Sequence, residues 1–169
     1  MWSSPGTARC RRKNPGNPDT DVLTRLMFSD KGELSRTELL YNCIFILNAG
    51  HETTANLVGN AIGTLDTHPQ QKANLIEDPD LINTAVDEFL RFESPNQLGN
   101  RLTNSDVELD GHIIPSQTNL HLVIGAANRD PTKFNNPDQF DLRRKPNRHL
   151  AFAGGPHACI GLNLARLEG

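Results

Sequence analysis

The chain has 169 residues, 36% of them hydrophobic and 22% charged, and its formal net charge is −3 at pH 7. This length suits one domain that buries roughly 70% of its unfolded surface, and the small negative charge argues against a general attraction to nucleic acid or membranes. The sequence holds no run of about 20 apolar residues that could span a bilayer. The three cysteines, Cys10, Cys43 and Cys159, are widely spaced, which favours a reducing, cytoplasmic setting over a disulfide framework.

The first 20 residues form a basic segment without apolar periodicity. The segment lacks the apolar core of a signal peptide, so we expect a disordered lead-in over residues 1–20. A short arginine-rich targeting segment, or a junction where upstream sequence was lost, is the alternative. The basic residues of this segment are Arg9, Arg11, Arg12 and Lys13.

Two helices are predicted next. A short amphipathic helix is expected over 21–28 and ends at the turn Lys31-Gly32. A capping box at Ser35 and Glu38 then opens a proline-free stretch that continues to Thr67. This stretch predicts a helix of about 30 residues, roughly 45–50 Å long, and its apolar residues predict burial on most sides.

The middle turn of that long helix interrupts its apolar pattern. Residues 49–54 read Ala-Gly-His-Glu-Thr-Thr. A helical glycine costs about 1 kcal/mol relative to alanine, and a threonine hydroxyl can bond the carbonyl four residues back. We therefore expect a kinked groove lined by small residues, an alcohol and a carboxylate. A polar turn on a surface helix is the alternative.

Shorter elements are predicted over the rest of the chain. Helices are expected over 69–76, where a proline stands at the start, and over 81–92, where Glu88 and Arg91 share one face. A turn at Asp110-Gly111 predicts a hairpin. Strands are expected over 97–103, 107–109, 112–114 and 119–123, a short helix over 124–129, and an irregular stretch over 132–147.

The most informative stretch is the loop 152–161, which reads Phe-Ala-Gly-Gly-Pro-His-Ala-Cys-Ile-Gly. Its glycines let the backbone turn sharply and approach a flat ligand closely. Cys159 comes just before a predicted helix over 162–167, a position that favours the thiolate as a metal ligand or nucleophile. The residues alone leave four interpretations: a buried structural thiol, a zinc ligand, a nucleophile paired with His157, and a single thiolate beneath a planar macrocycle.

The motif Phe152-x-x-Gly155-x-His157-x-Cys159-x-Gly161 resembles the haem-ligand loop of the cytochrome P-450 superfamily, the haem-thiolate monooxygenases. The turn 49–54 is similar to the central turn of that family's long distal helix, and Glu88-x-x-Arg91 is similar to its fixed structural pair. The resemblance covers roughly residues 20–169. It implies a mainly α fold with a small β component, the C-terminal half of the cytochrome P-450 fold. This half comprises the distal helix, the Glu-x-x-Arg helix, β-hairpins, the meander and the cysteine loop, in a partial domain over 21–169 truncated at both ends.

The resemblance also implies roles for individual residues. Cys159 is expected to be the axial ligand of the iron of haem b, and Arg101 and His157 are expected to hold the haem propionates. Thr53 is expected to hydrogen-bond dioxygen or an ordered water, and Glu52 to deliver protons to it. Thiolate ligation favours cleavage of the O–O bond.

The reaction that the resemblance implies inserts one oxygen atom from dioxygen into a small organic substrate. Electrons are expected from NAD(P)H through a ferredoxin or a similar donor protein. We expect no nucleic-acid or membrane partner. Two alternatives are an inactive truncated remnant or haem-binding fragment of such an enzyme, and a thiolate enzyme that isomerises or dehydrates without dioxygen. The pair Glu52-Thr53 argues against the latter.

The chain departs from the family pattern at Gln139, where many members carry an arginine that closes a triad with the Glu-x-x-Arg pair. Three arginines could replace it: Arg129, Arg143 and Arg144. The basic stretch before the cysteine loop is either a solvated loop or a docking patch for an acidic electron donor. Its residues are Arg143, Arg144, Lys145 and Arg148.

Overall fold

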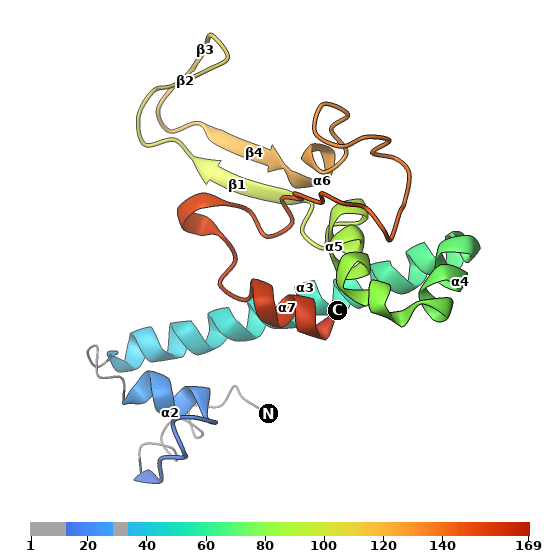
Figure 1. Cartoon of the computed structure of the whole chain (residues 1–169). Coiled ribbons are helices and arrows are strands. Elements are labelled where there is room, and N and C mark those ends of the chain that lie inside the picture. Colours follow the sequence, from blue (N-terminus) through green and yellow to red (C-terminus); the bar gives the residue numbers. More distant parts are fainter. Residues whose placement is uncertain (1–12, 29–33) are drawn as a thin grey trace. The chain divides into compact units, whose positions relative to one another are not determined.

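The computed structural model describes residues 13–28 and 34–169. The chain divides into two compact units, Met1–Glu52 and Thr53–Gly169, each described here by itself. The boundary falls inside α3 (Arg36–Thr67), which is helical throughout its 32 residues (Figure 1). The predicted turn at Lys31-Gly32, and most of the predicted lead-in over 1–20, lie outside the described residues.

The first unit contains α2 (Val22–Met27) and the first half of α3. Asp21 caps α2 by accepting a hydrogen bond from the backbone N–H of Leu23. The predicted capping box of α3 is confirmed, because the Ser35 hydroxyl accepts from the Glu38 N–H at 3.2 Å and the Glu38 carboxylate accepts from the Ser35 N–H at 2.8 Å. Hydrogen bonding of the Glu38 carboxylate to the Ser35 side chain, and then to the Ser35 backbone N–H, lowers the pKa of Glu38. A small core of Leu23, Met27 and Leu39 joins the two helices.

The prediction that α3 is buried on most sides is wrong for the described chain. Its buried apolar side chains are Leu39 and Leu57, at 3% and 2% exposure. Leu40 and Leu65 are half-buried. Seven other large apolar side chains are 40–68% exposed, since the described residues cover only part of the helix surface. They are Tyr41, Ile44, Phe45, Ile46, Leu47, Val58 and Ile62.

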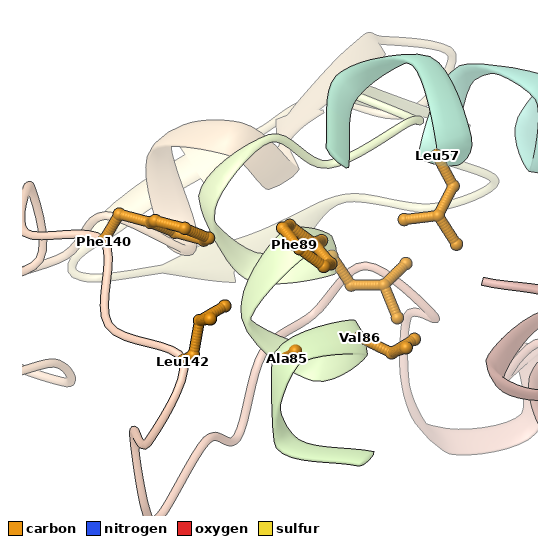
Figure 2. Packing of buried hydrophobic residues seen from close by; sticks show 7 residues of the cluster. Leu57, Ala85, Val86, Phe89, Phe140 and Leu142 are labelled. Atoms are coloured by element: carbon orange, nitrogen blue, oxygen red, sulfur yellow. The ribbon is translucent and has the colours of Figure 1, made fainter. Parts of the chain in front are cut away.

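The second unit is built around α5 (Ile82–Phe92), which follows α4 (Pro69–Glu77) and the short 3₁₀ turn η1 (Pro79–Leu81). Apolar residues at helical spacing on α5 face the core. They pack against one residue of α3 and two residues of the irregular stretch that precedes the cysteine loop (Figure 2). This core comprises Leu57, Ala85, Val86, Phe89, Leu90, Phe140 and Leu142.

Two small antiparallel sheets complete the second unit. β1 (Leu98–Leu102) pairs with β4 (Asn119–Val123), with Leu98 opposite Val123. β2 (Val107–Leu109) and β3 (His112–Ile114) form the predicted hairpin. Its turn residues Asp110 and Gly111 both have positive φ, 49° and 77°, as tight two-residue hairpin turns require. The helix after β4 is shorter than predicted, since α6 spans Ile124–Ala127.

The chain ends with the cysteine loop, which contains the 3₁₀ turn η2 (Gly155–His157), and with α7 (Leu162–Glu168). α7 lies against α5 and against the part of α3 that belongs to this unit (Figure 1). The predicted mainly α architecture with a small β component is confirmed. Within the described residues, no helix combines the length and apolarity needed to cross a bilayer.

Candidate functional site

The cysteine loop presents its thiol at the surface of the second unit. Cys159 is exposed, and its backbone N–H donates to the Phe152 carbonyl at 2.9 Å. Gly155 has φ +65°, a conformation that favours glycine, and it begins the η2 turn. α7 begins three residues after the sulfur, as predicted, and the intervening Ile160 is 96% exposed. The interpretation of Cys159 as a buried structural thiol is therefore wrong.

Three side chains of this unit that were predicted to bind a ligand have no acidic partner among the described residues. They are Arg101, His157 and Cys159. Arg101 lies on β1, is exposed, and donates to the backbone carbonyl of its neighbour Asn100 at 2.7 Å. His157 is exposed in η2, and no hydrogen bond joins it to Cys159 in the described chain. Residues 13–28 and 34–169 contain no cluster of three His, Cys, Asp or Glu side chains that could hold a metal ion, so the zinc interpretation lacks a ligand set there.

The donor set of the second unit fits a haem group. It offers one thiol for a metal and two cationic or donor side chains for two carboxylates. The same unit also exposes large apolar side chains, which suits a ligand that is mostly hydrophobic with one acidic edge. They include Leu98, Leu102, Leu122, Leu150, Ile160 and Leu164.

The predicted oxygen-handling pair lies on α3. Glu52 and Thr53 are neighbours in the sequence, and both are exposed. The boundary between the two units falls between them, so Glu52 belongs to the first unit and Thr53 to the second.

Glu88 and Arg91 form a fully buried ion pair on α5. Both side chains are 0% exposed, and two Arg91 nitrogens, Nε and Nη2, each donate to the Glu88 carboxylate at 2.8 Å. The remaining N–H groups of Arg91 donate to the carbonyls of Asn128, Pro137 and Gln139 at 2.8–3.3 Å. All five guanidinium donors are thus used. The alternative of an ordinary surface pair is wrong.

Arg144 is the second arginine that pairs with Glu88. Its Nε donates to Glu88 Oε2 at 3.1 Å, and its side chain is only 10% exposed. Its other nitrogens donate to backbone carbonyls, including that of Gln139 at 2.9 Å. Arg129 instead pairs with Asp138 at 3.1 Å, and Arg143 pairs with Asp78 at 3.4 Å.

Both predictions made for the basic stretch fail at Arg144, since a side chain held by Glu88 can neither be solvated nor dock a partner. Lys145 and Arg148 are exposed. Arg143 is 58% exposed in its ion pair. We name Glu88, Arg91 and Arg144 the carboxylate clamp.

Comparison with known proteins settles the family. The family model described as Cytochrome P450 matches residues 7–169. The chain belongs to the cytochrome P450 family.

Relatives in this family are closely similar in sequence and structure. The biotin biosynthesis cytochrome P450 of Bacillus subtilis is 45% identical over 158 residues, which are 93% of this chain and 40% of that protein. The vitamin D(3) 25-hydroxylase of Pseudonocardia autotrophica is 44% identical over 156 residues, covering 90% of this chain and 39% of that protein. The chain thus spans about 40% of the length of the curated relatives it matches.

The structural comparison confirms the predicted cytochrome P450 fold. The crystal structure of P450BioI in complex with an acyl carrier protein ligated to hexadec-9Z-enoic acid matches with a TM-score of 0.90 and 44% identity. The match covers 96% of this chain and 41% of that one. The cytochrome P450 CYP109Q5 from Chondromyces apiculatus matches with a TM-score of 0.89 and 39% identity, over 96% of this chain and 42% of that one.

Two asparagines, one buried and one half-buried, extend the clamp of this cytochrome P450 and were not predicted. Asn128 is 0% exposed; its amide N–H donates to Ser94 at 2.8 Å, and its side-chain oxygen accepts from the Leu150 N–H at 2.7 Å. Asn147 donates to Glu88 at 3.1 Å. Asn128 is the C-cap residue of α6, and Asn147 stands in the irregular stretch before the cysteine loop. At neither place does the sequence show that the side chain turns inward.

A second cluster connects α5 to the cysteine loop of this cytochrome P450. Asp87 Oδ1 lies 3.2 Å from His149 Nε2 and accepts from Arg166 Nε at 2.8 Å. The Ala151 N–H donates to His149 Nδ1 at 3.2 Å, so Nδ1 is an acceptor and the ring proton resides on Nε2. Burial lowers the pKa of His149, and this outweighs the opposite effect of the hydrogen bond to Asp87.

Proposed function

We propose that this chain carries the thiolate side of a haem monooxygenase that inserts one oxygen atom from dioxygen into a small organic substrate. The family match over residues 7–169, which includes the loop with the exposed Cys159, is the observation that supports this most strongly. We further propose haem b as the cofactor. When bound, a thiolate-ligated haem supplies the activation of dioxygen.

Each predicted site residue has a proposed part in this function. The Cys159 thiolate holds the iron, and its backbone N–H is already engaged by the Phe152 carbonyl at 2.9 Å, which fixes the loop below the sulfur. Arg101 and His157 donate to the two propionates and so orient the cofactor. The Thr53 hydroxyl orients an oxygen or water molecule, and the Glu52 carboxylate carries the proton to it.

The substrate and the electron donor are proposed only by class. The similar proteins act in biotin biosynthesis and on vitamin D(3) by their names, so the family match supports an organic substrate without choosing one. We propose NAD(P)H as the electron source through a ferredoxin or similar protein in the cytoplasm. Lys145 and Arg148 are the exposed cations proposed to meet it, with Arg144 excluded because it binds Glu88.

A haem-binding chain without turnover is the second candidate. The exposed apolar side chains of α3 favour it, because a monooxygenase must exclude bulk water from the oxygen site. Phe45 and Ile62, at 62% and 64% exposure, illustrate the surface that the described chain leaves open.

The two candidates are separated by one sequence of measurements on the full chain. Haem is added, iron is reduced, and carbon monoxide is bound; a red-shifted thiolate Soret band is expected. The protein is then supplied with NAD(P)H, ferredoxin reductase, ferredoxin and isotopic dioxygen over a panel of organic acids and sterols. Incorporation of one labelled oxygen atom supports the monooxygenase, haem binding without incorporation supports the second candidate, and absence of haem uptake contradicts both.

A further inference from the structure

One carboxylate contacts both flanks of the cysteine loop. Asp87 lies on α5, next to Glu88 of the carboxylate clamp. Its Oδ1 atom faces His149, three residues before the loop 152–161, and accepts a hydrogen bond from Arg166, five residues after that loop. Two segments separated by the whole loop therefore meet at a single oxygen atom.

The contacts continue from these flanks to the cysteine itself. The Arg166 guanidinium carbon lies 5.0 Å from the centre of the Phe152 ring. The centres of the His149 and Phe152 rings are 5.6 Å apart. The Phe152 carbonyl accepts the Cys159 N–H at 2.9 Å. Both partners of Asp87 thus touch the residue that holds the backbone of Cys159.

We propose that Asp87 is a positioning residue that fixes the Cys159 loop by binding both flanks of the loop. The consequence of this positioning for haem ligation rests on the function proposed above. An exposed ion pair such as Asp87–Arg166 contributes little by itself, with side chains 29% and 40% exposed. His149 makes the difference, because its side chain is 2% exposed and its other nitrogen is already bound by Ala151. Its Nε2–H must therefore find its acceptor at Asp87.

The substitutions Asp87→Asn and Asp87→Ala test this inference in the full chain. Loss of a charged hydrogen bond to a buried group increases local opening by about tenfold. We expect the Cys159 N–H to exchange with solvent about tenfold faster in Asp87→Ala, and less so in Asp87→Asn. Asp87→Glu keeps the charge and is expected to restore part of the protection. Amide exchange at Cys159, measured by NMR, needs no activity assay.

Asp138→Asn is the matched control. Asp138 also pairs with an arginine, Arg129 at 3.1 Å, but no hydrogen bond or ion pair joins its side chain to residues 149–166 in the described chain. Its substitution is expected to leave Cys159 exchange unchanged. Arg166→Gln changes an exposed side chain and serves if Asp87→Ala does not fold. Its effect on exchange is expected to be smaller than that of Asp87→Ala and to be reduced in the Asp87→Asn background, because both substitutions weaken the hydrogen bond at one oxygen atom.

The spectrum gives an independent reading of the same positioning. In haem-loaded protein, the fraction of the reduced, carbon-monoxide-bound thiolate band is expected to fall in Asp87→Ala and to stay at the wild-type level in Asp138→Asn. Unchanged exchange at Cys159 in Asp87→Ala, or additive effects of Asp87→Asn and Arg166→Gln, would overturn the proposal. Failure of the wild-type chain to bind haem contradicts the proposed function instead, and the exchange result still decides the role of Asp87.

Discussion

The carboxylate clamp and the side chains proposed to bind haem differ in burial and in their partners. In the clamp, Glu88 and Arg91 are 0% exposed, and every donor of Arg91 is used. Arg101, His157 and Cys159 are exposed and have no acidic partner among the described residues. The clamp is complete within the chain, whereas the second set is open to solvent and free to meet the haem that we propose it binds. Burial and partners, not residue type, thus separate the arginines of the clamp from the arginine proposed to bind haem.

Removing the clamp carboxylate should give the largest loss of stability. In Glu88→Gln, two buried guanidinium groups lose their shared negative partner, and we expect the free energy of unfolding to fall by about 3–5 kcal/mol. Urea denaturation measures this loss. Glu93→Gln is the matched control, because Glu93 is 47% exposed and lies 3.5 Å from Arg129. It should change the free energy of unfolding by less than about 1 kcal/mol, and equal losses in the two variants would contradict the clamp's special role.

Substitutions at two adjacent cations of the basic stretch should differ sharply in their effect on the free energy of unfolding. Arg144→Gln is expected to lower the free energy of unfolding by about 2–4 kcal/mol, because it leaves Glu88 with one ion-pair partner instead of two. Lys145→Gln changes an exposed side chain and should stay within about 0.5 kcal/mol. Chemical denaturation of both variants provides the comparison. A similar, small effect at both positions would show that the stretch is uniformly solvated.

Mild acid should weaken the contacts around His149. Burial lowers the pKa of His149 from 6.5, and the positive charge of Arg166 lowers it further. The negative charges of Asp87 and Glu88 oppose this shift without cancelling it. Above about pH 6.5 the His149 ring is neutral in both the folded and the unfolded chain. Below about pH 6.5 the ring takes up a proton in the unfolded chain at a higher pH than in the folded chain. The free energy of unfolding therefore falls as the pH decreases toward the pKa of the folded state. Protonation also turns Nδ1 into a donor that faces the Ala151 N–H.

The urea midpoint measured from pH 7.5 to pH 5.5 tests this dependence. A decline over this range is expected in the wild-type chain, and a smaller one in His149→Gln. The lowered pKa values of Glu38 and Asp130 act in the same direction but below pH 4.5, outside this window. A midpoint independent of pH in the wild-type chain would contradict the neutral, buried ring.

The smallest stability effects are expected among the side chains proposed to bind haem. Arg101→Gln and His157→Gln remove exposed groups and should change the free energy of unfolding by no more than about 0.5 kcal/mol. Both should nevertheless weaken haem binding, by about tenfold each if one charged hydrogen bond to a propionate is lost. Absorbance titration with haem measures this. Unchanged affinity in both variants would remove their proposed role.

The sequence predicted the elements of this fold well, because its signals are local. The capping box at Ser35 and Glu38, the turn at Asp110-Gly111 and the glycine loop before α7 each depend on neighbouring residues. The family resemblance predicted the cytochrome P450 fold, and the structural comparison confirmed it.

What the sequence left open depends on contacts between distant segments. From the sequence, three arginines were equally good candidates for the second ion-pair partner of Glu88. The path of the chain from Phe134 to Asn147 determines that Arg144 is the one that reaches it. The convergence of His149 and Arg166 on Asp87 is likewise a tertiary contact over more than 60 residues. The exposure of α3 was mispredicted because an apolar sequence shows that side chains favour burial. It does not show that the described residues supply the segments that would pack against them.

The most direct test of the account is the absorption spectrum of Cys159→Ser after haem addition, reduction and exposure to carbon monoxide. Cys159 is exposed and its side chain has no hydrogen-bond partner in the described chain, so the substitution should leave the unfolding midpoint almost unchanged. The account predicts that the red-shifted thiolate band, present in the wild-type protein, is absent from this variant. The same band at the same intensity in Cys159→Ser would show that another group holds the iron.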